Sequence, residues 1–284
     1  MEIERPRSLP EALAALAAHP GADLLAGGTD LMVEINFGRK RPERIIVVQP
    51  LGELRYLERD GVVRAGAGVT YTELLEQSGS SFAAVREMAR TVGSPQIRNA
   101  GTLGGNLGTS SPAGDSLPIL AAFDARVVLR SRRGERRLPF GEYMTGPKRN
   151  AKAPDEIVVG AEWRDPGPGQ TFLKVGTRNA MVIAVASLCL VIDRAAQVAR
   201  VALGSCGPTI VRARDAESFA EGLLAERGWD EPLDASDAAL AQFGELVAAA
   251  ARPIDDVRGS ARYRRHVLAV MGRRALQRVG GIVA

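Results

Sequence analysis

Two glycine-rich segments constrain this chain more than any other feature of its sequence. The first covers residues 25–31 and is centred on Gly27-Gly28-Thr29. The second covers residues 102–106, where a Gly-Gly pair again lies beside a threonine. Such a pair lets backbone N–H groups approach a phosphate without interference from a β-carbon. Neither segment has the spacing of a Rossmann G-x-G-x-x-G motif or of a P-loop.

The rest of the composition leaves few side chains for catalysis. The 284 residues predict about two domains, and a hydrophobic content of 45% is sufficient for real cores. Cys189 and Cys206 are too far apart for a cysteine zinc site or an iron–sulfur cluster held by this chain alone, and we expect buried, reduced thiols. His19 and His266 fit no Ser-His-Asp or Cys-His arrangement. We therefore predict no metal site, no certain catalytic residue and a dependence on a cofactor.

Charge and hydropathy argue against two classes of partner. The net charge is +4, but the basic cluster at residues 258–278 lacks interleaved aromatic residues apart from Tyr263, so no nucleic-acid binding is expected. The longest apolar run, residues 181–192, is about half as long as a membrane span. The first residues show no apolar signal region. We expect a cytoplasmic protein without a transmembrane segment.

The first 50 residues predict an α-β-α-β module with a glycine turn at a helix N-terminus, a favourable place for an anion. A capping box at Ser8 opens the first helix, and Thr29 is the expected N-cap of the second. The predicted elements are helices over residues 9–17 and 31–38 and strands over residues 23–26 and 44–49.

A second block, residues 54–164, contains a long segment without a clear pattern. Residues 92–115 include six glycines and two prolines, and a loop of that length is usually functional. The remaining predicted elements are strands over residues 54–57, 62–65, 125–130 and 156–163 and helices over residues 70–76 and 82–90.

A Pro- and Gly-rich stretch at residues 165–169 is the best domain boundary in the chain. Beyond it, the pattern predicts a small α+β domain. Its expected elements are strands at residues 171–176 and 198–204, with the apolar run of residues 181–192 between them, and helices near residues 213–226, 236–251 and 260–278.

Taken in order, these motifs resemble the FAD-binding subunit of the molybdenum hydroxylases, the family of carbon monoxide dehydrogenase and xanthine dehydrogenase. The resemblance spans essentially the whole chain. It is carried by residues 26–31 and 96–115, and residues 154–157, 172–174 and 263–268 add support.

The resemblance implies an α+β fold: a vanillyl-alcohol-oxidase-type FAD-binding domain of two α/β subdomains, followed by a small α+β C-terminal domain. The implied bounds are residues 1–165 for the FAD-binding domain, with subdomains of about 1–53 and 54–165, and residues 166–284 for the C-terminal domain.

The resemblance also implies an FAD site on the two Gly-Gly loops. Asp115 would bind the adenosine ribose, and Lys174 would reach the isoalloxazine edge, where a cation favours a reduced, anionic flavin. Apolar contacts would come from Val92 and Ile157. The implied FAD-binding residues are Leu25, Ala26, Gly27, Gly28, Thr29, Asp30, Leu31, Val92, Thr102, Gly105, Asn106, Thr109, Asp115, Ile157 and Lys174.

One segment departs from the family pattern. After Lys174, many relatives have an acidic residue in a Lys/Arg-x-x-x-Asp-Ile/Phe-Ala pattern, and residues 174–184 of this chain have none. Without this acidic residue, the chain lacks the charged group that many relatives have on this side of the flavin. The usual electron acceptor of the family is therefore not implied for this chain.

The implied function is electron transfer from two [2Fe–2S] clusters of a small subunit, through FAD, to an external acceptor, while a large molybdopterin subunit oxidises the substrate. The expected assembly is a heterotrimer, often doubled, and the C-terminal domain with its basic helix, including Arg264 and Arg265, is the expected partner surface. Two alternatives stay open from the residues: a self-contained flavin oxidase or reductase, and a non-catalytic nucleotide-binding module.

Overall fold

The protein forms two compact units in a computed structural model that describes residues 1–79 and 82–281. Unit 1 consists of residues 1–73, 94–110 and 124–164, and unit 2 consists of residues 74–93, 111–123 and 165–284. Each unit is thus assembled from three separate stretches of the chain. The predicted domain division at residues 165–169 stays a prediction.

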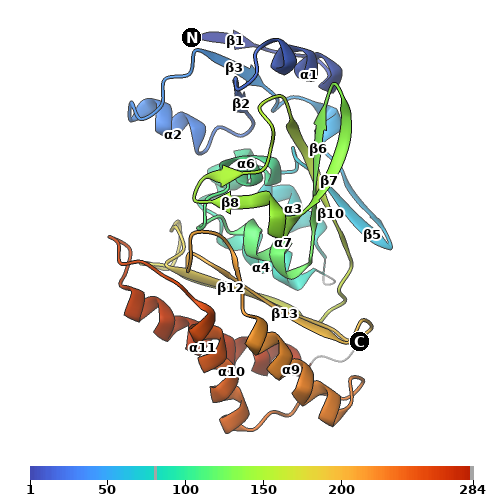
Figure 1. Ribbon diagram of the computed structural model, residues 1–284, viewed down its shortest axis with the longest axis vertical. Coiled ribbons are helices and arrows are strands. Elements are labelled where there is room, and N and C mark those ends of the chain that lie inside the picture. Colours follow the sequence, from blue (N-terminus) through green and yellow to red (C-terminus); the bar gives the residue numbers. More distant parts are fainter. Residues whose placement is uncertain (80–81, 282–284) are drawn as a thin grey trace. The chain divides into compact units, whose positions relative to one another are not determined.

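Unit 1 begins with a parallel three-stranded sheet in the order β1-β3-β2 (Figure 1). Its elements are β1 (Glu2–Glu4), α1 (Leu9–Ala18), β2 (Asp23–Leu25), α2 (Leu31–Asn36) and β3 (Arg44–Val47). The predicted module is confirmed, but sequence reasoning missed β1. Three residues are too short for a hydrophobic pattern. Beside its parallel backbone pairing with β3, this strand is held by ion pairs of Arg44 on β3 with Glu2 and Glu4.

The second sheet of unit 1 is antiparallel, in the order β4-β5-β10-β6-β7. Its elements and neighbours are the 3₁₀ turn η1 (Gly52–Leu54), β4 (Leu57–Asp60), β5 (Val62–Gly66), β6 (Arg126–Ser131), β7 (Gly134–Pro139), α8 (Phe140–Tyr143), β8 (Met144–Gly146), β9 (Arg149–Asn150) and β10 (Ile157–Arg164). Helix α3 (Tyr71–Gln77) begins in unit 1 and ends in unit 2. A core cluster joins the two sheets, with Leu13 and Leu16 of α1 packed with Ile46 and Ile157.

Residues 92–115 are not a structureless loop. They contain α5 (Pro95–Ala100) and α6 (Leu103–Thr109). Both helices have side-chain caps, because Ser94 Oγ accepts from the Ile97 N–H at 3.4 Å and Thr102 Oγ1 accepts from the Gly105 N–H at 3.0 Å. Each helix is shorter than two turns and α6 contains three glycines, so neither gives a periodic apolar signal.

Two further expectations in unit 1 were wrong at the ends of elements. The chain enters α2 through Asp30, without a side-chain cap, so Thr29 is not the N-cap. The stretch predicted as a strand at residues 54–57 is the end of η1 and an irregular link, and extended structure begins only at Leu57.

Unit 2 is built on the antiparallel sheet β11-β12-β13-β14. The elements are α4 (Ala83–Thr91), α7 (Ser116–Ala122), β11 (Gln170–Val175), β12 (Ala186–Asp193), β13 (Val198–Gly204), β14 (Val211–Arg212), α9 (Arg214–Arg227), α10 (Asp237–Ala250) and α11 (Ala261–Gly280). Figure 1 shows α9, α10 and α11 on one face of this sheet and α4 and α7 on the other. Alternate residues of β12, including Leu188 and Leu190, belong to the core shared with the three C-terminal helices. The apolar run at residues 181–192 forms a strand only from Ala186 onward.

A buried arginine ties three segments of unit 2 together. The Arg264 side chain is 1% exposed, and its guanidinium donates to the carbonyls of Val185 (2.5 Å) and Ser205 (2.9 Å). It also binds the Asp256 carboxylate at 2.6 Å. The neighbouring Arg258 guanidinium holds the pKa of Asp256 at about 2, so this carboxylate is charged at neutral pH. Arg264 is therefore a structural residue, which corrects its expected place on a partner surface.

We predict that Arg264→Leu lowers the unfolding free energy of the chain by about 3 kcal/mol, because two buried carbonyls and a carboxylate lose their donor. The matched control is Arg265→Leu, which replaces an exposed arginine of the same helix and is expected to change stability by less than about 0.5 kcal/mol. Urea unfolding followed by circular dichroism measures both. Equal midpoints for the two variants would contradict the assignment.

Candidate functional site

The first glycine turn presents a row of unpaired backbone donors. Within the described residues, the structure gives no hydrogen-bond acceptor to the backbone N–H groups of residues 27–31. The turn links the end of β2 to the start of α2, and Gly28 lies at φ +70°, a conformation that favours glycine. Consecutive N–H groups in such a turn form a concave site for an anion.

The second glycine segment packs directly against this turn. A β-carbon on Gly27 would lie 1.7 Å from the carbonyl oxygen of Ala100, at the end of α5. A β-carbon on Gly105 would lie 3.1 Å from Thr102 Oγ1 and 3.9 Å from the Ala26 side chain. Gly27 thus permits the close approach of two segments more than 70 residues apart in the sequence, while Gly105 makes its tight contact within its own segment.

The backbone donors of the second segment are already occupied. At the start of α6, the N–H of Leu103 donates to the Val69 carbonyl (3.0 Å) and that of Gly104 to the Ala67 carbonyl (2.8 Å). The Gly105 N–H donates to Thr102 Oγ1, and the Asn106 N–H donates to the Thr102 carbonyl. A phosphate held by backbone donors therefore fits the first turn and not the second. A role of Thr102 and Asn106 through their side chains stays a prediction.

Thr109 and Asp30 connect the two segments at the surface of unit 1. Thr109 Oγ1 lies 3.3 Å from Asp30 Oδ2. Lys148, which sequence reasoning missed, lies 2.8 Å from Glu34 on α2 and 3.9 Å from Asp30. The glycine turn is thus bordered by an ammonium group 118 residues away in the sequence. Its only sequence signal is the rarity of lysine in this arginine-rich chain.

Unit 2 contributes a second group of predicted residues, an ion pair buried inside it. Lys174 Nζ lies 2.5 Å from Asp115 Oδ2 and donates to the Thr91 carbonyl at 3.1 Å. The lysine side chain is 4% exposed and the aspartate side chain 9%. Burial raises the pKa of Asp115 to about 6, and the Lys174 ammonium opposes this rise.

One oxygen of this pair lacks a partner. Asp115 Oδ1 is buried and has no hydrogen-bond partner among the described residues. Buried polar atoms are normally paired, and an unpaired one costs about 1–3 kcal/mol. A hydroxyl or amide donor of a ligand would satisfy it.

The ion pair does not test the roles inferred for its two members. The resemblance placed Asp115 at the adenosine ribose and Lys174 at the isoalloxazine, at opposite ends of an extended FAD, whereas the two side chains lie 2.5 Å apart in this structure. Both roles stay predictions.

The other predicted residues divide between surface and core. Leu25 ends β2 and Val92 ends α4, and both are half-buried. Ile157 is 2% exposed and packs in the core of unit 1. Its contact with a cofactor stays a prediction, while its packing role is observed.

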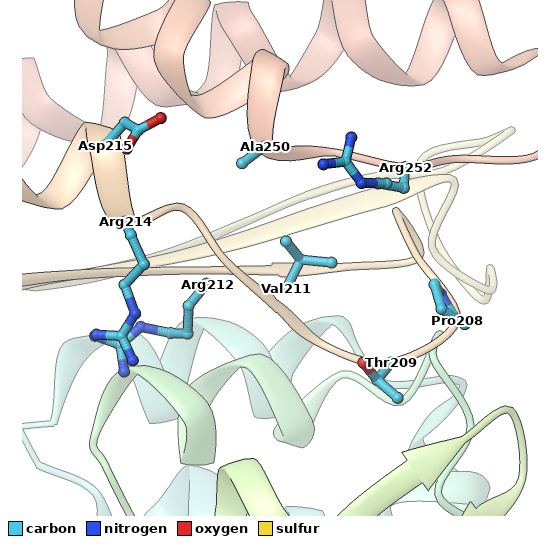
Figure 2. Close-up of a pocket in the computed structure, with 8 residues that line it drawn as sticks. All are labelled: Pro208, Thr209, Val211, Arg212, Arg214, Asp215, Ala250 and Arg252. Carbon is cyan, nitrogen blue, oxygen red and sulfur yellow. The ribbon is translucent and has the colours of Figure 1, made fainter.

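A separate hollow of about 440 Å³ lies in unit 2 at the start of α9 (Figure 2). It is lined by three arginines, of which Arg212 and Arg214 both pair with the buried Glu217 at 2.5 and 3.1 Å. None of the predicted site residues lines it. Glu217 offsets much of the positive charge of the arginines that line this hollow. The lining residues include no recognisable nucleophile or acid–base pair.

Other functional classes find no support in the described part of the chain. No group of three or more potential metal ligands occurs there, and no helix in it is long and apolar enough to cross a membrane. Both cysteines are free and buried, and burial raises the pKa of each thiol.

Comparison with known proteins agrees with this arrangement. Residues 1–162 match the family described as the FAD binding domain in molybdopterin dehydrogenase, and residues 171–279 match the CO dehydrogenase flavoprotein C-terminal domain. The chain is 31% identical over 283 residues to the xanthine dehydrogenase FAD-binding subunit of Escherichia coli O157:H7, covering 96% of this chain and 93% of the relative. It is 37% identical over 194 residues to the nicotinate dehydrogenase FAD-subunit of Eubacterium barkeri, covering 65% and 66% of the two chains.

Comparison with solved structures finds a similar fold in the same family. A chain of carbon monoxide dehydrogenase from Hydrogenophaga pseudoflava superposes with a TM-score of 0.87 at 26% identity, covering 100% of this chain and 98% of that one. The expected fold, an FAD-binding domain followed by a C-terminal domain, is confirmed.

The buried carboxylate predicts a pH dependence of stability. Because the folded-state pKa of Asp115, about 6, lies above the unfolded value near 3.9, the folded state binds the proton more tightly. The stabilisation that the protonated Asp115 carboxyl provides is therefore present below pH 4. It is lost as the pH rises through 6, which lowers the free energy of unfolding by roughly 1–3 kcal/mol. We expect urea unfolding at pH 4.5 and 7.5, without added ligand, to show this loss in the wild type. The loss should be absent in Asp115→Asn, and parallel behaviour of the two proteins would refute it.

Proposed function

Since the chain belongs to the family of FAD-binding subunits of the molybdenum hydroxylases, we propose that it holds one FAD non-covalently. In this proposal it passes electrons from [2Fe–2S] clusters of a partner subunit to an external acceptor. It works in a heterotrimer, or a dimer of heterotrimers, with that small subunit and a large molybdopterin subunit. A cytoplasmic location belongs to the same proposal.

The observation that carries the proposal is the row of unpaired N–H groups at residues 27–31. A dinucleotide has a doubly charged pyrophosphate, and five neighbouring donors at a helix N-terminus suit that charge. Within unit 2, the unpaired Asp115 Oδ1 suits a hydroxyl or N–H donor of a ligand. Neither glycine segment contains cysteine or histidine, so neither offers a side chain for a covalent flavin link.

FAD supplies a carrier that exchanges one or two electrons, which is the chemistry needed between clusters and a two-electron acceptor. The chain's own residues bind and orient it. The first turn in unit 1 would hold the pyrophosphate. Within unit 2, the Asp115–Lys174 pair is a buried carboxylate and ammonium whose charges offset each other. Two cysteines, both buried, are too few for a [2Fe–2S] cluster, so the electron donor belongs to another chain.

Position 105 provides a sharp test of the two-segment site. Gly105→Val places methyl groups between Thr102 and Ala26, which should displace the first turn and reduce bound FAD at least tenfold. Gly108→Val is the matched control, because it lies in the same helix with open space around its β-carbon. Flavin absorbance per polypeptide, with circular dichroism to verify folding, measures both. Full FAD occupancy in a folded Gly105→Val protein would exclude the second segment from the site.

The partner surface is proposed on the C-terminal part of unit 2, where apolar side chains are exposed. Ile254 is 68% exposed, Val257 is fully exposed and Tyr263 is half-exposed. Exposed apolar groups that lie close together mark interaction sites. These residues border the loop that Asp256 and Arg264 hold in place.

We expect Val257→Glu to weaken co-purification of the cluster-bearing subunit at least tenfold while FAD stays bound, because a charge would be buried at the contact. Ala225→Glu, on the exposed side of α9, is the control and should assemble normally. Unchanged assembly of Val257→Glu would move the interface elsewhere. A wild-type chain that recruits no cluster-bearing partner from its co-expressed neighbours would refute the electron-relay proposal.

A further inference from the structure

Helix α11 has a solvent face that carries no negative charge. Its opposite face belongs to the core of unit 2, where Leu268 and Leu276 are buried. The helix contains no acidic residue from Ala261 to Gly280. Its exposed basic side chains are those of Arg262, Arg265, His266, Arg273, Arg274 and Arg278. They form a surface about 30 Å long, because a helix rises about 1.5 Å per residue, and we call this surface the basic face of α11.

Two arginines of the basic face are held by carboxylates of neighbouring elements. Arg273 binds Asp237, the first residue of α10, with 2.6 Å between nitrogen and oxygen. Arg278 binds Glu87 of α4 at 2.8 Å and also donates to Thr171 Oγ1 at 3.1 Å. Both guanidiniums are therefore oriented before any partner binds, which lowers the entropy lost on association.

Two carboxylates just before the helix are engaged as well. Asp255 Oδ1 accepts from the Ala261 N–H at 2.5 Å, and Asp256 binds the buried Arg264. Within the described residues, three guanidiniums of the basic face have no hydrogen-bond or ion-pair partner: those of Arg262, Arg265 and Arg274. Carboxylates that pair with these three belong to another molecule.

A hollow of about 420 Å³ lies beside the last two turns of the basic face. It is lined by Leu173 of β11 and by Arg274, Gln277 and Arg278 of α11, all within unit 2. The Arg278 guanidinium is fixed by its contact with Glu87, while that of Arg274 is free to form two parallel hydrogen bonds with a carboxylate. The apolar wall and the two guanidiniums suit the insertion of a glutamate or aspartate side chain.

We propose that the basic face of α11 docks onto an acidic surface of a different subunit of the complex, and that a carboxylate side chain of that subunit enters the hollow beside Arg274. The inference rests on the proposed function, because it concerns the same assembly. Tyr263, which belongs to the proposed apolar partner surface, lies on α11 itself, so the apolar and basic surfaces adjoin. Arginine and tyrosine are enriched at protein interfaces.

The extent of the basic face favours a macromolecule, and its charges favour a protein. Arg262 and Arg274 are about 18 Å apart along the helix axis, which is too far for one small anion. An anionic membrane fits less well, because Asp237, whose side chain is 89% exposed, would face the negative headgroups. A second copy of this chain would place like charges opposite each other across a two-fold interface. Carboxylates of a different protein are positioned individually, and a planar guanidinium binds each of them with two donors.

The experiment expresses the full chain with its neighbouring subunits and measures how much of each subunit co-purifies with it. We expect the wild-type chain to retain at least tenfold less of its partners at about 0.5 M NaCl than at about 0.05 M, because salt screens the ion pairs. At the lower concentration, Arg262→Glu/Arg265→Glu/Arg274→Glu should retain at least tenfold less than the wild type and keep its bound FAD. The variant Arg262→Lys/Arg265→Lys/Arg274→Lys keeps the charge and should assemble to within about threefold of the wild type.

The matched control is Arg126→Glu/Arg130→Glu/Arg132→Glu, which reverses three exposed arginines of unit 1, changes the net charge equally and should assemble like the wild type. Undiminished assembly of the α11 glutamate variant, or an equal loss in the control, overturns the inference. So does binding of the wild-type complex to phosphatidylglycerol vesicles that the glutamate variant loses while its subunits stay together, which would make the basic face a membrane surface. A wild-type chain that binds FAD but recruits no subunit at either salt concentration refutes the electron-relay proposal, and this inference with it.

Discussion

The contact between Gly27 and the carbonyl of Ala100 determines what unit 1 can present to a ligand. At 1.7 Å from that oxygen, no β-carbon fits, so the first turn and the end of α5 approach each other only because residue 27 is glycine. The approach fixes the turn in a shape whose N–H groups have no acceptor within the described residues. The second segment, whose own N–H groups are taken up by Ala67, Val69 and Thr102, acts as the support for the first.

In unit 2, the dominant constraint is electrostatic. A buried ion pair recovers the cost of desolvation only when its remaining hydrogen-bonding positions are filled. The Lys174 ammonium gains a second acceptor at the Thr91 carbonyl, but Asp115 retains one oxygen without a partner among the residues described. The pair is thus organised without a ligand, and its geometry is fixed before any ligand binds.

Local rules predicted most of the elements of this fold, and distant contacts explain where they failed. The cap at Ser8 acts within four residues and forms as predicted through the Ser8 side chain, although the Glu11 carboxylate accepts from the Arg7 N–H and does not complete the capping box with Ser8. The occupation of the α6 donors depends on Ala67 and Val69 in another part of unit 1, and the Asp115–Lys174 pair joins residues 59 apart, so neither was accessible to pattern reasoning. The resemblance identified the family correctly, while the cofactor roles that it implies for the glycine segments, Asp115 and Lys174 stay predictions. The prediction that Arg264 lies on a partner surface was wrong because its partners are distant in the sequence. A charged side chain in a basic helix is expected in solvent, and the carbonyls that bind Arg264 are known only from the structure.

The buried position of Arg264 also has a consequence for the order of folding during synthesis. Its acceptors at Val185, Ser205 and Asp256 all leave the ribosome before it does. The β12–β13 pairing and the hydrogen bond from Ser205 to the Ala184 carbonyl can form earlier, but the guanidinium that binds all three acceptors arrives only with α11, 59 residues after Ser205. During that interval, the nascent chain leaves an apolar face of the sheet uncovered. Chaperone binding or misassembly therefore competes with folding until α11 docks.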